Sequence, residues 1–153
     1  MRDGMGILDW TGKAGSIATG LPMNEYELRW MVWWRALGYA LVAIVIWLSL
    51  TPQPPELHVE QGDKLQHVVA YGALMLWFAQ LHAGRARAGA ALALVVLGVA
   101  LEGVQGLTGY RSFDVIDMAA NTAGVVLGLA AGPPRLPNVL RLFERCVKRD
   151  AVH

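Results

Sequence analysis

Apolar residues along the chain gather into four long blocks. The blocks run from about 30 to 50, 65 to 82, 88 to 107 and 113 to 132. Each is close to the roughly 20 residues that an α-helix needs to cross the hydrocarbon core of a bilayer. No block shows the period-2 alternation of a half-buried strand, and an open sheet cannot satisfy its backbone groups in lipid. The pattern therefore predicts an all-α fold, an integral membrane four-helix bundle.

Proline, glycine and clustered polar residues mark the ends of the blocks. Proline lacks the N–H that continues a helix and restricts the residue before it, so Pro52, Pro54 and Pro55 should end the first helix. The other boundaries are predicted at Gly84-Arg85-Ala86-Arg87, at Thr108-Gly109-Tyr110-Arg111-Ser112 and at Gly132-Pro133-Pro134. The chain then divides into an N-terminal region (1–29), a membrane domain (30–132) and a basic cytoplasmic tail (133–153).

The two terminal regions differ from the membrane domain in composition. Residues 1–29 are rich in glycine and small residues, which predicts a disordered or flexible segment, and Met23 is an alternative start to Met1. The first block begins too late and is too long for a cleaved signal peptide, so it is interpreted as an uncleaved anchor. The tail alternates apolar and basic residues. This suits either an amphipathic helix on an anionic membrane face or a solvated basic segment.

Composition and charge narrow the class of protein further. Of the 153 residues, 55% are hydrophobic and 16% are charged, whereas an average soluble domain is roughly a quarter charged. The single cysteine, Cys146, excludes an internal disulfide and a cysteine metal cluster. Eleven of the 13 Lys and Arg residues fall on one side of the predicted crossings, and only Lys64 and Arg111 fall on the other. The positive-inside rule then places both termini in the cytoplasm, and this topology explains the basic residues without nucleic acid binding.

Polar residues interrupt the blocks at one depth, the extracytoplasmic ends of the predicted helices. A charged group inside hydrocarbon costs about 2.5–3.5 kcal/mol on insertion scales, so the helix faces that carry such groups should turn toward one another. Spacing at i, i+3 and i+7 in the second and fourth helices puts each set on one face. The ten residues are Asp63, Lys64, His67, Tyr71, Glu102, Gln105, Arg111, Asp114, Asp117 and Asn121.

Acids outnumber bases in this predicted set. Lys64 and Arg111 should pair with some of the four carboxylates. The excess negative charge must be solvated, protonated, or matched by His67, by a metal or by a cationic ligand group. By contrast, Ala120, Gly124 and Gly128 form a small-xxx-small row, which predicts close helix packing rather than chemistry.

The same residues resemble a known family of bacterial membrane proteins. The run from Asp63 to Tyr71 is similar to the DK-x-x-H-x-x-x-Y segment of the VanZ-like family. Its E-x-x-Q, R-x-x-D-x-x-D and N-x-x-G patterns are matched in order and spacing by Glu102 to Gln105, Arg111 to Asp117 and Asn121 to Gly124, and the exit Ser49-Leu50-Thr51-Pro52 also fits. The likeness spans roughly residues 36–130 and implies a multi-pass protein of the bacterial inner membrane. The family is named for a protein associated with resistance to the antibiotic teicoplanin, and its general activity is not established.

Three functions remain open from the sequence, and a non-enzymatic role is favoured. In the first, the ten residues bind a cell-envelope lipid head group, a lipid-linked wall precursor or a glycopeptide-related ligand, with Lys64 and Arg111 holding an anionic group. The second is an intramembrane hydrolase or transferase acting on a lipid-linked phosphate, with His67 as base or nucleophile beside Glu102 or Asp117. The third is a purely structural network of ion pairs. Membrane lipids are the expected partners, and no cofactor or resident metal is expected.

Overall fold

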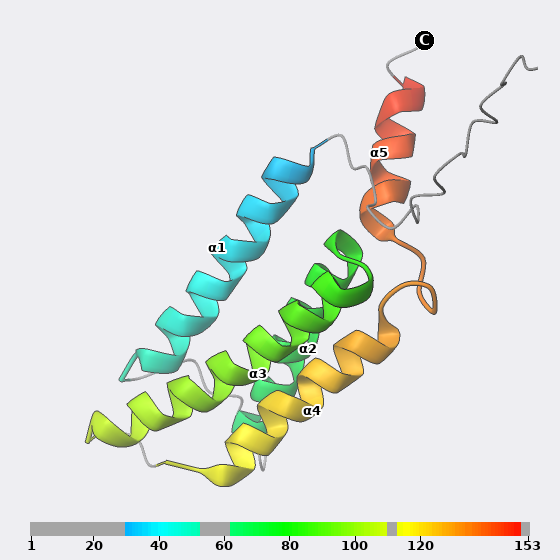
Figure 1. Ribbon diagram of the computed structural model, residues 1–153. Helices are drawn as coiled ribbons and strands as arrows, with labels where there is room; N and C mark the ends of the chain where they lie inside the picture. Colours follow the sequence, from blue (N-terminus) through cyan, green and yellow to red (C-terminus); the bar gives the residue numbers. More distant parts are fainter. Residues whose placement is uncertain (1–29, 53–61, 110–112, 151–153) are drawn as a thin grey trace, which may run out of the picture.

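The computed structural model describes residues 30–52, 62–109 and 113–150, and over these ranges the chain forms five α-helices and no strand. The helices are α1 (Met31–Leu50), α2 (Gly62–Leu81), α3 (Gly84–Leu107), α4 (Val115–Ala131) and α5 (Val139–Asp150). Helices α1 to α4 run alternately up and down, and α5 projects beyond the end of the bundle where α4 stops (Figure 1). The all-helical class predicted from the sequence is confirmed. The predicted flexible region 1–29 lies outside the described residues.

One predicted boundary is wrong. The run Gly84-Arg85-Ala86-Arg87 begins α3 instead of separating it from α2, so only His82 and Ala83 link the two helices. Gly84 has a φ of +51°, a left-handed value that glycine adopts without a Cβ clash. The backbone N–H of Arg87 donates to the Ala83 carbonyl and closes the first turn of α3. A glycine in this position starts a helix, although in the sequence it has the character of a helix breaker.

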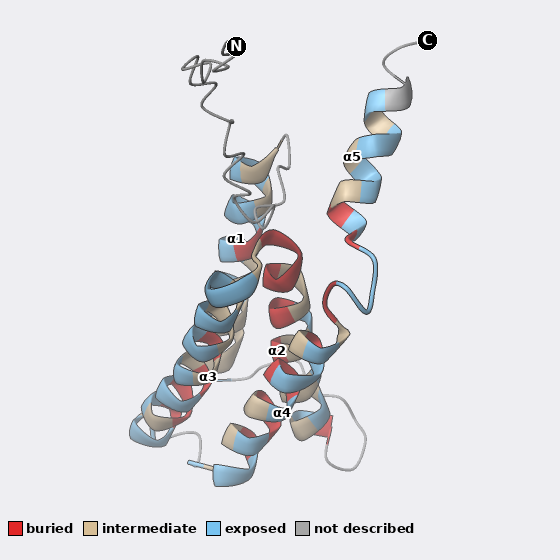
Figure 2. Ribbon diagram, turned by 45° about the vertical axis from the view of Figure 1, so that its right-hand side comes forward, coloured by how far each residue is buried: buried red, intermediate tan, exposed pale blue. Residues whose placement is uncertain are grey.

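Two helices, α1 and α3, are long and apolar enough to span a membrane. Helix α4 is also apolar but shorter, at 17 residues, and α2 carries Asp63 and Lys64 in its first turn. Much of the surface of α1 is exposed (Figure 2), and its Val32 and Trp33 are 77% and 74% exposed. Leu92 of α3 is 65% exposed. Large apolar surfaces of this kind are rare on water-soluble monomers, and lipid is the environment that suits them.

Helices α2 and α4 pack against each other backbone to backbone. A Cβ built on Gly124 would collide with the backbone oxygen of Val68, and one built on Gly128 would collide with that of Gly72. Only hydrogen fits at these two positions. Because lipid supplies little hydrophobic drive between helices, such close contact is a main source of attraction between them in a membrane. The packing role predicted for the small-residue row is confirmed.

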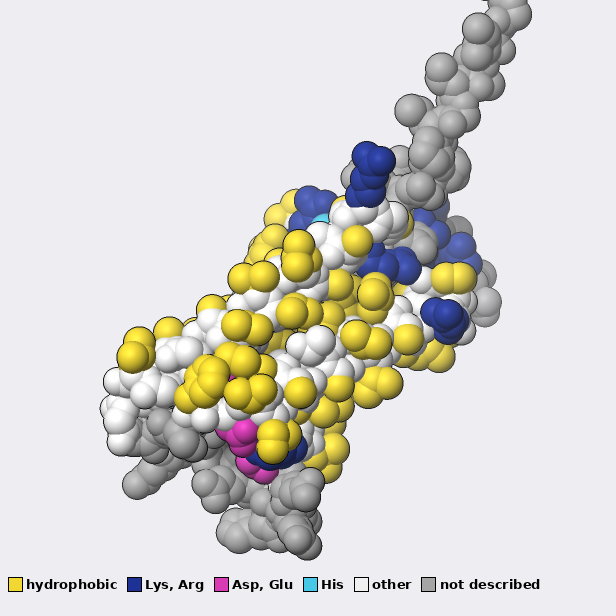
Figure 3. Space-filling model, turned by 60° about the horizontal axis from the view of Figure 1, so that its bottom comes forward, with side chains coloured by type: hydrophobic (Ala, Val, Ile, Leu, Met, Phe, Trp, Pro, Cys, Tyr) yellow, Lys and Arg dark blue, Asp and Glu magenta, His cyan; other side chains and the backbone are white. Residues whose placement is uncertain are grey.

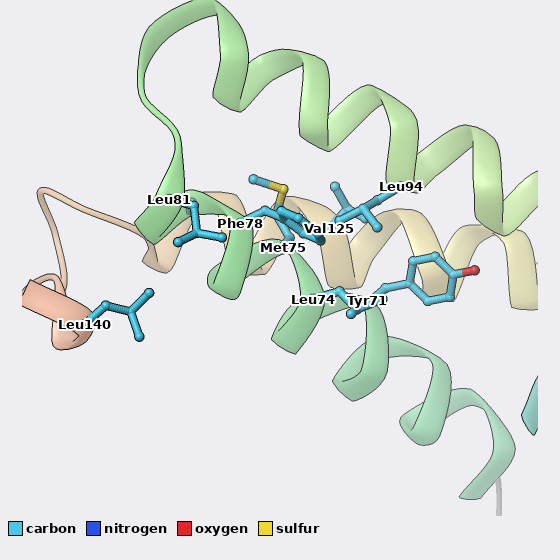
Figure 4. Close-up of a cluster of buried hydrophobic side chains, with 9 residues drawn as sticks. Tyr71, Leu74, Met75, Phe78, Leu81, Leu94, Val125 and Leu140 are labelled. Carbon is cyan, nitrogen blue, oxygen red and sulfur yellow. The ribbon is translucent and has the colours of Figure 1, made fainter. Parts of the chain in front are cut away.

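The apolar core lies along the inner face of α2 (Figure 4). Its buried side chains from α2 include Tyr71, Leu74, Met75 and Phe78, which follow the i, i+3, i+4, i+7 spacing of one helix face. They pack with Leu94 of α3 and Val125 of α4. The ring of Tyr71 lies at one end of this core, and its hydroxyl points away from the other labelled side chains (Figure 4). The core therefore ends at Tyr71, toward the beginning of α2.

Charged side chains separate toward the two ends of the bundle. The acidic side chains in view gather at one end, and most of the Lys and Arg side chains in view lie toward the other (Figure 3). Among the described residues, the acidic end includes Asp63, Asp114 and Asp117, with Lys64 as its one basic residue. The opposite end, called the basic end below, carries Arg35, Arg85, Arg87, Arg135, Arg141, Arg145 and Lys148.

Candidate functional site

The predicted site residues meet where α2 and α4 begin and α3 ends. Nine of the ten are among the described residues, and Arg111 lies outside them. Asp63 is exposed at the rim, and Lys64, His67 and Asp114 are half-buried. The buried floor consists of Tyr71, Glu102, Gln105, Asp117 and Asn121. These nine residues are called the polar cluster below.

Carboxylates surround the ammonium group of Lys64. Its Nζ donates to Asp117 Oδ1 at 2.7 Å, to Asp63 Oδ2 at 2.9 Å and to Asp114 Oδ2 at 3.0 Å. An ammonium group has three protons, and each of them has an acidic acceptor here. The ion pairs predicted for Lys64 are therefore present. Because all three protons of this ammonium group are donated to carboxylates, the geometry argues against the predicted role of Lys64 in binding an anionic group.

Asp114 joins the end of α3 to the beginning of α4. As the N-cap of α4, its Oδ1 accepts the backbone N–H of Ile116 at 2.8 Å, which satisfies one of the free donors at a helix start. Its own backbone N–H donates to Glu102 Oε1 of α3 at 2.8 Å. The hydrogen bond from Lys64, and then that from Ile116, lowers the pKa of Asp114 below its ordinary value of 3.8. Asp114 is therefore held as a carboxylate.

His67 lies between an amide and a carboxylate from α4. Its Nδ1 is 3.0 Å from Asn121 Oδ1, an acceptor, so the geometry suits a proton on Nδ1. In a neutral ring Nε2 is then an acceptor, and it faces Asp117 Oδ2 at 3.7 Å. Two acceptors that face each other repel unless a proton or a donor lies between them. Asp117 thus contacts Lys64 through one oxygen and approaches His67 with the other.

Two oxygens in the floor of the cluster have no hydrogen-bond partner within the described part of the chain. They are Glu102 Oε2 and the hydroxyl oxygen of Tyr71, and both residues are only 1% exposed. The other carboxyl oxygen of Glu102 accepts the Asp114 N–H, so this side chain is anchored within the cluster. A buried polar group left unpaired costs about 1–3 kcal/mol. Such groups are few in native proteins and are often found where function requires them.

Gln105 and Gly98 play structural parts that the sequence did not reveal. Gln105 Nε2 donates to the backbone oxygen of Ser49 at 2.7 Å, so its amide N–H joins α3 to the end of α1. A Cβ on Gly98 would lie 3.0 Å from Asn121 Cβ and 3.2 Å from Tyr71 Cε1. The bare backbone of Gly98 therefore lets these two side chains pass beneath α3. The only feature of the sequence that could have indicated this role is that a small residue stands one helical turn before Glu102.

The polar cluster is richer in acceptors than in donors. It contains four described carboxylates, those of Asp63, Glu102, Asp114 and Asp117, against the single ammonium group of Lys64. Across the described ranges, no group of three or more His, Cys, Asp or Glu side chains is arranged to hold a metal ion. The chemistry that this arrangement suits best is the binding of a group that donates hydrogen bonds or carries positive charge.

Comparison with known proteins gives a match at the level of the family. The family model described as VanZ/LLP1 matches residues 8–133, which is well over half of the chain. No curated protein and no solved structure matches the chain. The matched range contains the whole polar cluster and ends before α5.

Proposed function

Because the chain belongs to the VanZ/LLP1 family, we propose that this membrane protein binds a molecule of the bacterial cell envelope through its polar cluster. The two long apolar helices support a membrane location. In the proposal, α1 to α4 all cross the inner membrane, with both termini in the cytoplasm and the polar cluster at the outer face. The gathering of the other described Lys and Arg residues at the basic end supports this orientation.

The observation that carries the proposal is the carboxyl oxygen of Glu102 that has no hydrogen-bond partner among the described residues, buried beneath a cluster rich in acceptors. Lys64 already has three acidic partners, and His67 Nε2 faces a carboxylate at 3.7 Å. A ligand with N–H or O–H donors would supply a hydrogen bond to the Glu102 oxygen and a donor between His67 Nε2 and Asp117. An ammonium group would also reduce the excess negative charge among the described residues. The favoured ligand is therefore an envelope molecule with a primary ammonium group on its head.

Short-chain lipids that differ in their head groups test this choice. Phosphatidylethanolamine offers three N–H donors, phosphatidylcholine carries the charge without any N–H, and phosphatidylglycerol has no ammonium group. Each dihexanoyl lipid is titrated into the full chain in detergent, and binding is followed by the shift in thermal unfolding. We expect the ethanolamine lipid to bind at least about tenfold more tightly than the other two, because a hydrogen bond to a charged group contributes about 1.5–3 kcal/mol.

Matched variants link any binding to the site. Glu102→Gln replaces Oε2 of the carboxylate by an amide nitrogen, which donates instead of accepting, and we expect it to weaken binding of the ethanolamine lipid about tenfold. Glu144→Gln is the same chemical change at the basic end of the molecule and should leave the affinity unchanged. Equal affinity for all three lipids, or full affinity in Glu102→Gln, would overturn the proposal. If cluster substitutions changed only the free energy of unfolding, the structural network would be the better explanation.

A second candidate function is hydrolysis or transfer at a lipid-linked phosphate. It is favoured by the position of His67, which is held by Asn121 and faces Asp117, as a general base requires. Release of phosphate from a labelled lipid pyrophosphate by the purified protein, lost in His67→Gln and kept in Glu144→Gln, would establish it. No release above the protein-free rate would exclude that substrate.

A further inference from the structure

Helix α5 is attached to the basic end of the bundle at its first turn. The side chain of Gln80, at the end of α2, accepts the backbone N–H groups of Val139 and Leu140 at 2.8 and 3.4 Å. Asn138 Nδ2 donates to the Gln80 backbone oxygen at 2.7 Å. Asn138 also caps α5, because its Oδ1 accepts the backbone N–H of Arg141 at 3.0 Å. The beginning of α5 is therefore part of the folded domain.

The second turn of α5 packs at the beginning of α1. Glu144 Oε1 accepts the backbone N–H of Trp30 at 3.0 Å and the indole N–H of Trp34 at 2.8 Å. The ring of Phe143 lies 6.2 Å from that of Trp30 and 5.8 Å from that of Trp34. Tryptophan at the end of an apolar helix is typical of the membrane–water interface. Phe143 therefore lies at the depth where α1 enters the membrane in the proposed arrangement.

An apolar stripe on α5 remains exposed after this docking. Val139, Leu142, Phe143 and Cys146 are all exposed, and they follow the i, i+3, i+4, i+7 spacing of one helix face. Arg145 and Lys148 are exposed outside this stripe. Most of the Lys and Arg side chains in view also lie toward the basic end of the molecule (Figure 3). With 3.6 residues per turn, Arg145 lies beside this stripe and Lys148 lies on the opposite face of the helix. The helix thus presents an apolar strip with positive charge beside it, the pattern of a helix that lies at a lipid surface.

We propose that α5 is an interfacial helix that binds anionic phospholipids, with the apolar stripe in the acyl boundary and Arg145 at the phosphates. Phe143, a member of the stripe, lies beside Trp30 and Trp34 at the beginning of α1, and the outward-facing surface of α1 is itself apolar. Glu144 is the one acidic side chain described on α5, and its carboxylate already accepts two N–H groups from α1. The exposed charge on the described side chains of α5 is therefore positive and complements an anionic leaflet.

Charge also argues against a second copy of the chain as the occupant. If two copies joined through this stripe, Arg145 of each copy would lie beside the same contact. Such like charges repel at close range, and the Glu144 carboxylate already has its two donors within the chain. A bilayer that contains anionic lipid avoids this repulsion and attracts the same side chains. The inference concerns α5 alone and does not depend on the ligand of the polar cluster.

The single cysteine allows a direct test, because Cys146 is exposed and belongs to the stripe. The full chain is labelled there with an environment-sensitive fluorophore and placed in nanodiscs of phosphatidylcholine, with or without phosphatidylglycerol. We expect phosphatidylglycerol to shift the emission to the blue and to protect the label from aqueous iodide. Lipids brominated in the acyl chain should then quench it. Arg145→Gln should lower the ratio of bound to free helix about fivefold, the effect of one charge at the surface.

Two controls separate lipid binding from other causes. Arg85→Gln removes an exposed charge from the same end but from α3, and it should leave the response nearly unchanged. A label on Lys148→Cys in a Cys146→Ser background should stay accessible to iodide, because position 148 lies outside the stripe. Equal emission and free iodide access in both kinds of nanodisc would overturn the proposal. So would protection without phosphatidylglycerol, or protection that appears only when two copies share one nanodisc.

Discussion

Replacement of Gly128 by alanine should separate α2 from α4 and weaken the bundle. The new methyl carbon would collide with the Gly72 backbone oxygen and would lie 2.9 Å from Met75 Cβ and 3.0 Å from the Leu76 backbone nitrogen. Carbon atoms attract best at about 3.5–4.0 Å, and two of these three neighbours are backbone atoms that cannot rotate away. The helices must therefore move apart along a contact that depends on close approach.

The size of the effect follows from two opposing contributions. Alanine is favoured over glycine in a helix by about 1 kcal/mol, while an extra methyl group in a tight contact costs about 1–3 kcal/mol. Here the clash is with rigid backbone, so we expect Gly128→Ala to lower the free energy of unfolding by about 1–2 kcal/mol. Gly128→Val should lower it by about 3 kcal/mol because a β-branched side chain adds two more carbons.

A matched substitution in open space provides the control. A Cβ on Gly89 of α3 would meet nothing within 4 Å, so Gly89→Ala should raise stability by up to about 1 kcal/mol. Both variants are unfolded in mixed micelles by increasing fractions of dodecyl sulfate, and helix content is followed by circular dichroism. If Gly128→Ala were as stable as Gly89→Ala, the backbone contact between α2 and α4 would not be what holds these helices together.

Three further outcomes follow from the structure. Lys64→Ala leaves three carboxylates without their cation and should lower the free energy of unfolding by about 2–3 kcal/mol, whereas Asp63→Asn at the exposed rim should cost less than about 1 kcal/mol in the same micelle assay. Because the folded-state pKa of Asp114 lies below 3.8, its stabilising contribution is complete above pH 3.8 and is lost as the pH falls through the folded-state pKa; a carboxyl titration followed by NMR should show this shift reduced in Lys64→Met, where only the Ile116 N–H still favours the carboxylate, and an unchanged titration would refute the pairing. Glu144→Ala should release α5, seen as faster amide hydrogen exchange over 139–150 and altered emission from Trp34, and unchanged exchange would contradict the docking.

Much of the fold was predictable because apolar runs report helices directly. The first block, predicted to run from about 30 to 50, corresponds to α1 within one residue at its start. Helical spacing also indicated which polar faces should meet, and the pairing of Lys64 with acids from α4 bears this out. Gly84 misled the prediction because its role depends on backbone conformation. From the sequence alone, a glycine that starts a helix with a left-handed φ cannot be distinguished from a glycine that interrupts one.

Contacts between distant parts of the chain could not be predicted from local pattern. Glu144 accepts N–H groups from Trp30 and Trp34, 114 and 110 residues away along the chain, and no periodicity relates these positions. Gln105 looked like a ligand-binding residue but its amide N–H donates to the Ser49 backbone oxygen in α1. Both contacts depend on how helices are placed in space, which propensity and spacing do not specify.

The glycine contacts between α2 and α4 allow only discrete alignments of the two helices. The backbone oxygens of Val68 and Gly72 in α2 face the bare positions at Gly124 and Gly128 of α4. A slip by a single residue would bring Val125 or Leu129 to a place where only a hydrogen atom fits. The two helices can therefore pair only in discrete registers and cannot slide gradually from one register to the next. Lys64 belongs to α2 and Asp117 belongs to α4, so the register of the two helices also fixes the position of the Lys64 ammonium group relative to the Asp117 carboxylate.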